Sequence, residues 1–86
     1  MEIADWRRQI DDLDRKLVDL LNQRAAAARE IGRLKQAANF AIYEPARERE
    51  IYANICRVNH GPLPDSKLIQ VFERIVDVMR NFQIKS

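Results

Sequence analysis

The sequence predicts an all-α protomer of three helices with one long N-terminal helix, and two observations carry this prediction. Apolar residues recur at alternating steps of three and four through residues 2–38, the spacing of a helix packed along another helix. Apart from Gly32, glycine and proline occur only at Pro45 and in the segment 61–64, so two shorter helices are expected to follow. No stretch shows the alternation of apolar and polar residues that is typical of a strand.

The first helix is expected to extend beyond its own domain. At a rise of ~1.5 Å per residue it is on the order of 55 Å long, whereas a globule of 86 residues is only about 24 Å across. Its outer half therefore needs a partner, and a second copy of the chain is the simplest one. The apolar seam, interrupted at Arg24, consists of Ile3, Trp6, Ile10, Leu13, Leu17, Leu20, Ala27, Ile31, Leu34 and Ala38.

Residues 39–43 read as a short connection to a second helix that opens at Glu44-Pro45 and runs to about Val58. Proline is harmless in the first turn of a helix, where its missing N–H would have no partner. The segment 59–64 contains Gly61, which suits a left-handed cap, and prolines that cannot continue the helix. Asp65-Ser66 is expected to cap a third helix. Its apolar face comprises Leu68, Phe72, Ile75, Met79 and Phe82, flanked by Ile69 and Val76.

Composition limits the class of protein. The length predicts a single domain, residues 1–86. The lone Cys56 excludes an intrachain disulfide and fits a reducing cytoplasm. A net charge of +2, with a third of the residues charged, indicates a mixed surface and no nucleic-acid partner. The start of the chain does not resemble a signal peptide, and no apolar run is long enough to cross a membrane.

Several polar residues lie where the helical pattern calls for apolar ones. Arg24 interrupts the seam, and a buried arginine is costly unless it is paired. Lys35 follows eleven residues later, so that the two cations differ by roughly 20° around the helix and are about 16 Å apart along it. Only small or apolar residues lie between them on that face, which suggests an anion site. The alternatives are a snorkelling or register-setting arginine and a solvated lysine near a helix end.

The second and third helices add similar residues. Glu48 shares a face with apolar neighbours and follows Arg47 directly, although a surface pair of this kind is common. Gln83 lies on the apolar face of the third helix, where a buried amide needs partners, unless the helix frays there. Arg7 lies about 25 Å along the axis from Arg24. It can serve the same site only if a second chain supplies it.

What the sequence lacks is also informative. It has no Ser/His/Asp set, no metal-spaced Cys/His cluster and no Gly-rich phosphate loop. The single histidine, His60, falls in a turn and is expected to be solvated. An enzyme built from these residues would therefore depend on the placement of charges, with no metal and no cofactor.

The chain resembles the all-helical chorismate mutases over nearly its full length. The resemblance rests on Trp6-Arg7 leading into 10–14, on residues 20–24, on Glu30-Ile31-Gly32-Arg33-Leu34-Lys35, on 43–50, and on Phe72 with Gln83 eleven residues later. It implies a three-helix protomer interlocked with a second one in a helical homodimer. It also implies an enzyme that rearranges chorismate to prephenate in aromatic amino-acid biosynthesis.

The resemblance implies roles for seven residues. Arg24 and the Arg7 of the second chain would hold the two carboxylates of the substrate. Lys35 would contact a carboxylate and the ether oxygen, which Gln83 would reach from the other side. The ring hydroxyl would be held by Glu48, Arg47 and Glu44. Glu44 departs from the family, which often has Asp there, and Met79 stands where a small or hydroxylated residue is frequent.

Two other enzymes on the same fold remain open, an isochorismate pyruvate lyase and an aminodeoxychorismate mutase. The Arg47-Glu48 pair favours the chorismate mutase, because a ring hydroxyl needs a partner there. A rival from another class is a non-catalytic helical dimerisation module or a basic nucleic-acid binder, whose binding should weaken steeply with salt. A fusion or complex with another enzyme of the aromatic pathway is also open.

Overall fold

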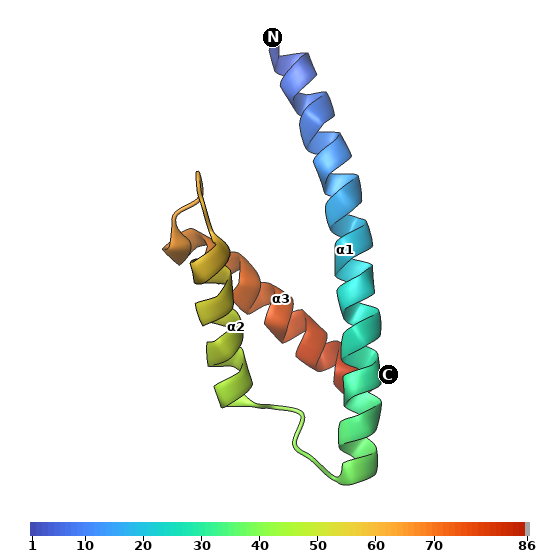
Figure 1. Cartoon of the computed structure of the whole chain (residues 1–86). Coiled ribbons are helices and arrows are strands. Elements are labelled where there is room, and N and C mark those ends of the chain that lie inside the picture. Colours follow the sequence, from blue (N-terminus) through green and yellow to red (C-terminus); the bar gives the residue numbers. More distant parts are fainter. Residues whose placement is uncertain (86) are drawn as a thin grey trace.

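The computed structural model describes residues 1–85 of the chain, with side chains up to Gln83, and is built from three helices (Figure 1). These are α1 (Ile3–Ala38), α2 (Pro45–Val58) and α3 (Asp65–Lys85). The predicted order of a long helix followed by two shorter ones is confirmed. Ser86, the last residue of the predicted domain, lies outside the described residues.

Helix α1 sets the dimensions of the protomer. Its 36 residues correspond to about 54 Å at the usual rise, and the molecule measures 54 × 24 × 16 Å. The radius of gyration is 15.7 Å, against about 12 Å for a compact domain of this length. The N-terminal half of α1 extends past the other two helices (Figure 1).

Local signals account for most of the helix boundaries. Asn39 ends α1 in the left-handed conformation with φ of 60°, and Phe40 N–H donates to the Lys35 carbonyl at 2.7 Å. Gly61 has φ of 76°, as the turn between α2 and α3 was expected to require. The cap predicted at Asp65-Ser66 is wrong by one residue, because Asp65 already belongs to α3 and the Pro64 carbonyl accepts the N–H of Leu68.

Helix α3 packs against both other helices, whereas α1 and α2 do not pack against each other. The face of α1 that is buried within the protomer contains Ala28 and Gly32, one position away from the predicted seam. The seam residue Ile31 stays 48% exposed. Two small residues thus form the buried part of α1, and they allow α3 to approach closely.

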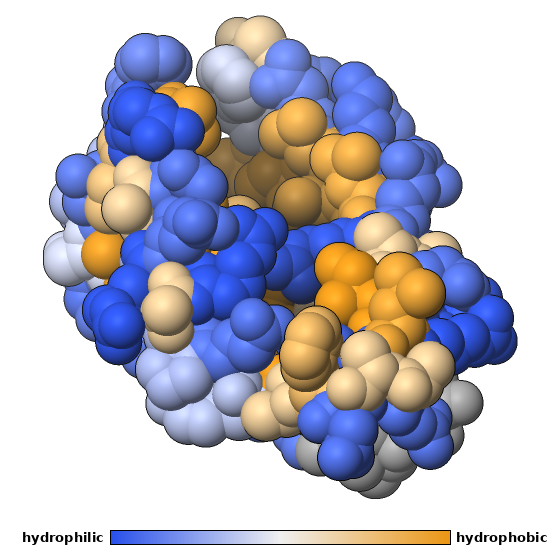
Figure 2. All heavy atoms as spheres, turned by 60° about the horizontal axis from the view of Figure 1, so that its bottom comes forward, coloured by the Kyte–Doolittle hydropathy of each residue, from blue (hydrophilic) through white to orange (hydrophobic). Residues whose placement is uncertain are grey.

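Most of the predicted seam is uncovered. Its members Ile3, Trp6, Ile10, Leu13, Leu17 and Leu20 are all more than half exposed. Among the described residues the buried hydrophobic side chains are Ala28, Val76 and Met79. The accessible surface is 7003 Å², about 1,700 Å² more than a compact monomer of this mass exposes. Figure 2 shows hydrophobic residues bordering a hollow between the helices.

No helix in the described part of the chain combines the length and the apolar character needed to cross a membrane.

Candidate active site

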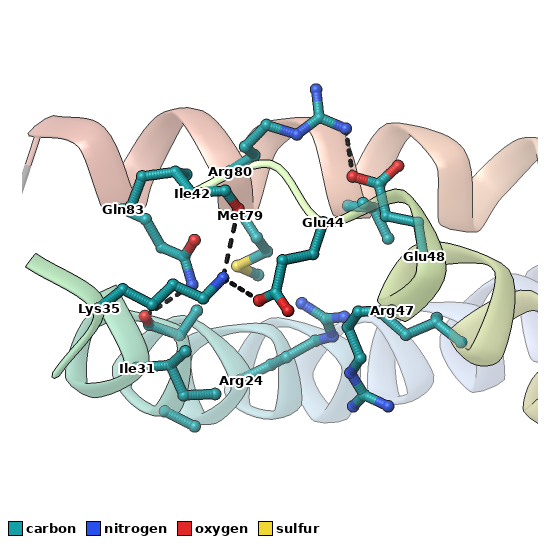
Figure 3. Close-up of a pocket in the computed structure, with 14 residues that line it drawn as sticks. Arg24, Ile31, Lys35, Ile42, Glu44, Arg47, Glu48, Met79, Arg80 and Gln83 are labelled. Atoms are coloured by element: carbon teal, nitrogen blue, oxygen red, sulfur yellow. Dashed lines mark hydrogen bonds and ion pairs between the residues drawn. The ribbon is translucent and has the colours of Figure 1, made fainter. Parts of the chain in front are cut away.

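A cavity of about 400 Å³ lies between the three helices and is lined by residues from all of them (Figure 3). The connection between α1 and α2 closes one side of it with Ile42. The full lining consists of Arg24, Ala27, Ala28, Ile31, Lys35, Ile42, Glu44, Arg47, Glu48, Ile51, Val76, Met79, Arg80 and Gln83.

The cavity brings together seven of the eight residues singled out from the sequence. Helix α1 contributes Arg24 and Lys35, the start of α2 contributes Glu44, Arg47 and Glu48, and α3 contributes Met79 and Gln83. The eighth, Arg7, is exposed and is not part of the lining. It lies seventeen residues before Arg24 on the same helix, so Arg7 is about 25 Å from the cavity of its own chain.

Arg24 is a partly buried cation with no acceptor of its own. Among residues 1–85 it forms no hydrogen bond and no ion pair, and Figure 3 shows its guanidinium close to that of Arg47. Burial lowers the pKa of Arg24 below its usual value, and the positive charge of Arg47 lowers it further. Arginine nevertheless remains protonated in proteins. The two guanidiniums therefore favour binding of an anion between them.

Lys35 is held at the wall of the cavity by the Ile42 carbonyl and the Glu44 carboxylate. Its side chain is only 12% exposed. The ammonium donates to the Ile42 carbonyl at 3.2 Å and lies 2.5 Å from Glu44 Oε1. Figure 3 shows both contacts at the edge of the cavity. An anionic ligand that reaches Lys35 must share this cation with Glu44 or displace the carboxylate.

Gln83 closes the cavity from α3, where it meets α1. Its side-chain amide donates from Nε2 to the Ala28 carbonyl at 2.9 Å. A Cβ atom built on Gly32 would lie 3.3 Å from both Cβ and Cγ of Gln83. Gly32 therefore leaves the space in which the Gln83 side chain runs across α1. The space left by Gly32 and the hydrogen bond to Ala28 together fix the orientation of the Gln83 amide.

Arg80 is a lining residue that the sequence analysis did not identify. Its Nη2 donates to Glu48 Oε2 at 2.6 Å, which makes an ion pair between α3 and α2. The sequence does carry a signal, because Arg80 lies three residues before Gln83 and therefore on the same side of α3. The signal was weak, since an arginine next to an apolar face is usually a solvated one.

The charges of the lining sum to a positive value. Four cations, Arg24, Lys35, Arg47 and Arg80, stand against the carboxylates Glu44 and Glu48, which leaves a net charge of +2 in the cavity. In the part of the chain that the structure describes, no group of three or more His, Cys, Asp or Glu residues could hold a metal ion. The lining fits a small molecule that carries two negative charges and an apolar body.

The fold and the cavity thus define an all-helical protein with a cavity whose lining carries a net positive charge. The chain belongs to the chorismate mutase type II family, whose model matches residues 6–84. The family resemblance recognised in the sequence is confirmed.

Solved structures of the family superpose closely on this chain. A chorismate mutase from Thermus thermophilus is 30% identical with a TM-score of 0.95, and the match covers 98% of this chain and 96% of that one. A chorismate mutase from Helicobacter pylori, solved in complex with prephenate, is 31% identical with a TM-score of 0.89. That match covers 96% of this chain and 90% of the other.

Curated relatives include longer proteins. The bifunctional chorismate mutase/prephenate dehydratase of Aquifex aeolicus is 35% identical over 98% of this chain, which spans only 24% of that protein. A chorismate mutase from Methanocaldococcus jannaschii is 26% identical over 88% of this chain and 78% of its own length. The domain therefore occurs both within bifunctional proteins and in a chain of similar length.

Gly32→Ala should separate stability from activity. A methyl group would press on Gln83 at 3.3 Å and displace its amide by a few tenths of an ångström. Alanine also stabilises a helix interior by about 1 kcal/mol relative to glycine, which offsets the strain. We expect urea unfolding to change by less than about 1 kcal/mol while turnover falls at least severalfold. Unchanged turnover would show that the position of Gln83 does not depend on Gly32.

Proposed function

We propose that this chain catalyses the rearrangement of chorismate to prephenate. The observation that carries the proposal is Arg24, a partly buried cation without an acceptor among the described side chains, in a cavity whose lining has a net charge of +2. Chorismate is a dianion of suitable size with two carboxylates to hold. Membership of the family and the likeness to an enzyme solved with prephenate support the same substrate.

The reaction requires no nucleophile, proton transfer or oxidant. The ether C–O bond breaks as a new C–C bond forms, within one molecule, and the electrons move in a single cyclic step. The enzyme has to select the compact conformer and stabilise the negative charge that develops on the ether oxygen. Placement of fixed charges accomplishes both tasks, and the cavity consists mainly of such charges and apolar walls.

Two arginines would select the conformer by holding one carboxylate each. Arg24 offers a planar fork that can bind a carboxylate through two parallel hydrogen bonds. Arg7 of the partner subunit would hold the second carboxylate, because the Arg7 of the same chain is about 25 Å from the cavity. Clamping both ends keeps the reacting carbons close together, which removes an entropic part of the barrier.

Lys35 and Gln83 would stabilise the developing charge. They come from α1 and α3, and both carry N–H groups near the cavity. Lys35 would exchange its contact with Glu44 for a substrate carboxylate and the ether oxygen. One donor of this kind in a site that excludes water lowers the barrier by about 2.7–4 kcal/mol. Met79 would supply part of the apolar wall.

Glu48 would accept the hydrogen bond of the ring hydroxyl, with Arg47 and Glu44 beside it. This acceptor favours the chorismate mutase over an isochorismate pyruvate lyase or an aminodeoxychorismate mutase. Purified protein assayed in parallel with chorismate, isochorismate and aminodeoxychorismate tests the choice. Loss of the chorismate ultraviolet band with formation of prephenate is expected. Faster turnover of either alternative substrate would replace this proposal.

The uncovered seam of α1 supports a homodimer. Six apolar side chains between Ile3 and Leu20 are more than half exposed, and the surface in excess of a compact monomer is about 1,700 Å² per protomer. Two such surfaces together match the interfaces of obligate dimers. Mutual packing of two long helices would also bring each Arg7 toward the cavity of the other chain.

The bifunctional relatives suggest a further kind of partner, a second enzyme. The bifunctional proteins make a fusion or complex with another aromatic-pathway enzyme compatible with this domain. We expect the reaction to take place in the cytoplasm, where the free Cys56 stays reduced.

Arg24→Ala and Lys35→Ala should each lower kcat roughly a hundredfold or more, because each removes a clamp or a donor. The free energy of unfolding should fall little in both variants. For Arg24→Ala it should stay level or rise, because the substitution removes a partly buried cation without a partner. Chorismate kinetics and urea unfolding of both variants provide the measurements. Near-normal rates in both would show that the cavity is not the active site.

The dimer should be obligate. Because the described part of one chain buries so few apolar side chains, an isolated protomer gains too little to offset the conformational entropy of folding. Sedimentation equilibrium combined with circular dichroism should show that helix content and dimer are lost together on dilution. A folded monomer at micromolar concentration would refute this.

Mixing Arg7→Ala with Arg24→Ala should restore activity. Each variant alone is expected to be nearly inactive, but in a mixed dimer one site carries both defects and the other carries neither. With random pairing, half of the dimers are mixed, and each mixed dimer has one intact site out of two. About a quarter of the wild-type activity should therefore return. No recovery after verified subunit exchange would mean that Arg7 does not act across the dimer.

A further inference from the structure

Arg80 makes three side-chain contacts beside the cavity. Its Nη2 binds Glu48 Oε2 at 2.6 Å, and its Nη1 lies 3.6 Å from Asp77 Oδ1 on its own helix. Its guanidinium carbon lies 4.8 Å from the centre of the Tyr43 ring, a cation–π geometry. One residue of α3 therefore contacts α2 and the connection that precedes it.

The second observation is that Glu48 depends on this arginine. The Glu48 side chain is 18% exposed, and Arg80 is the partner of its carboxylate among the side chains that the structure describes. The bond uses Oε2 alone, so Oε1 remains able to accept another hydrogen bond. Figure 3 shows the Glu48 carboxylate turned toward α3 and away from the guanidinium of Arg47.

Without Arg80, the Glu48 carboxylate would be drawn toward other cations of the cavity. Arg47 precedes it on α2 but is already paired with Glu50, whereas Arg24, which lies across the cavity, has no carboxylate partner among the described side chains. A carboxylate in this surrounding is attracted to the nearest unpaired cation, and the attraction is stronger in a partly desolvated site than in water. Released from α3, Glu48 would pair with Arg24, which the proposed substrate needs.

We propose that Arg80 is a positioning residue that holds Glu48 on the α3 side of the cavity and neutralises its charge, so that this subsite receives a neutral hydroxyl group in preference to a cation. The proposal rests on the function proposed above and deepens it. Arg80 remains a cation, because arginine stays protonated in proteins, and its hydrogen bond to Glu48 raises its pKa further.

Neutralisation has a consequence for substrate choice. A lone carboxylate attracts an ammonium group more strongly than a hydroxyl, because the ammonium adds a full charge to the hydrogen bond. A carboxylate already paired with a guanidinium carries little net charge and loses most of that preference. Aminodeoxychorismate, which carries an amine where chorismate carries the ring hydroxyl, is the matching probe for this effect.

The first experiment compares Arg80→Met and Arg80→Lys with the control Arg33→Met. Methionine keeps most of the apolar stem without the charge, and Arg33 is an exposed arginine paired only with Glu30 in the described structure. We expect Arg80→Met to lower kcat with chorismate about tenfold to a hundredfold. Its KM should change less than kcat. Arg80→Lys should recover part of the loss, and Arg33→Met should behave as wild type.

Selectivity gives the readout that a purely structural role would not move. Binding of aminodeoxychorismate relative to prephenate, measured by calorimetry, should shift toward the amine about tenfold or more in Arg80→Met. An unchanged ratio would overturn the neutralising role. A kcat for Arg80→Met equal to that of wild type would overturn the positioning role.

A double-mutant cycle tests whether Arg80 acts through Glu48. In a Glu48→Gln background, Arg80→Met should cost little further activity, because its target is already altered. Losses that simply multiply would show that Arg80 acts directly on the substrate, and the proposal would fail. The same four proteins should also be unfolded in urea at one dimer concentration. The effect of the double substitution on the unfolding equilibrium constant should differ severalfold from the product of the two single effects.

The unfolding cycle keeps this inference separate from the proposed function. Wild-type protein that does not convert chorismate would contradict the proposed function alone. Additive effects of the two substitutions on the free energy of unfolding would contradict the Arg80–Glu48 coupling, whatever substrate the enzyme uses.

Discussion

The close contact of α3 with α1 at Gly32 and Ala28 determines where the polar side chains of the cavity lie. Since Gly32 has no side chain, the Gln83 side chain runs across α1 and reaches the Ala28 carbonyl at 2.9 Å. Met79 and Arg80 then lie against the same cavity, because they precede Gln83 by about one helical turn. Even a methyl group at position 32 would press on the Gln83 side chain and shift it by a few tenths of an ångström.

The cavity combines charges that would not be stable together without compensation. Lys35 has Glu44 beside it and Arg80 has Glu48, whereas Arg24 has no such partner in the described part of the chain. The two carboxylates thus reduce the repulsion among four cations and leave an excess of positive charge. This excess attracts a dianion, and the paired cations stay oriented without it. Most of these charges are in place before a ligand arrives, as electrostatic catalysis requires, and Lys35 alone among the four cations has to exchange its carboxylate partner for the ligand.

The length of α1 links folding to the proposed chemistry. A helix of 36 residues cannot be covered by two shorter helices that reach only its C-terminal half (Figure 1). In the proposed homodimer the exposed seam would supply the missing hydrophobic burial, and the same packing would carry Arg7 into the other cavity. Stability and the completion of the site would then arise from one interface.

The sequence by itself determined the three helices, because their limits depend on local features such as the apolar spacing, Pro45 and Gly61. Its helical pattern also singled out Arg24, Lys35, Arg47, Glu48 and Gln83, and the resemblance to a family added Glu44 and Met79; all seven line the cavity. Only the tertiary structure showed that Ala28 and Gly32, one position away from the predicted seam, are the buried residues of α1. It also revealed the Arg80–Glu48 pair, whose members are 32 residues apart. Such pairings depend on how closely helices approach and at what angle, and neither quantity is encoded within a single turn of the chain.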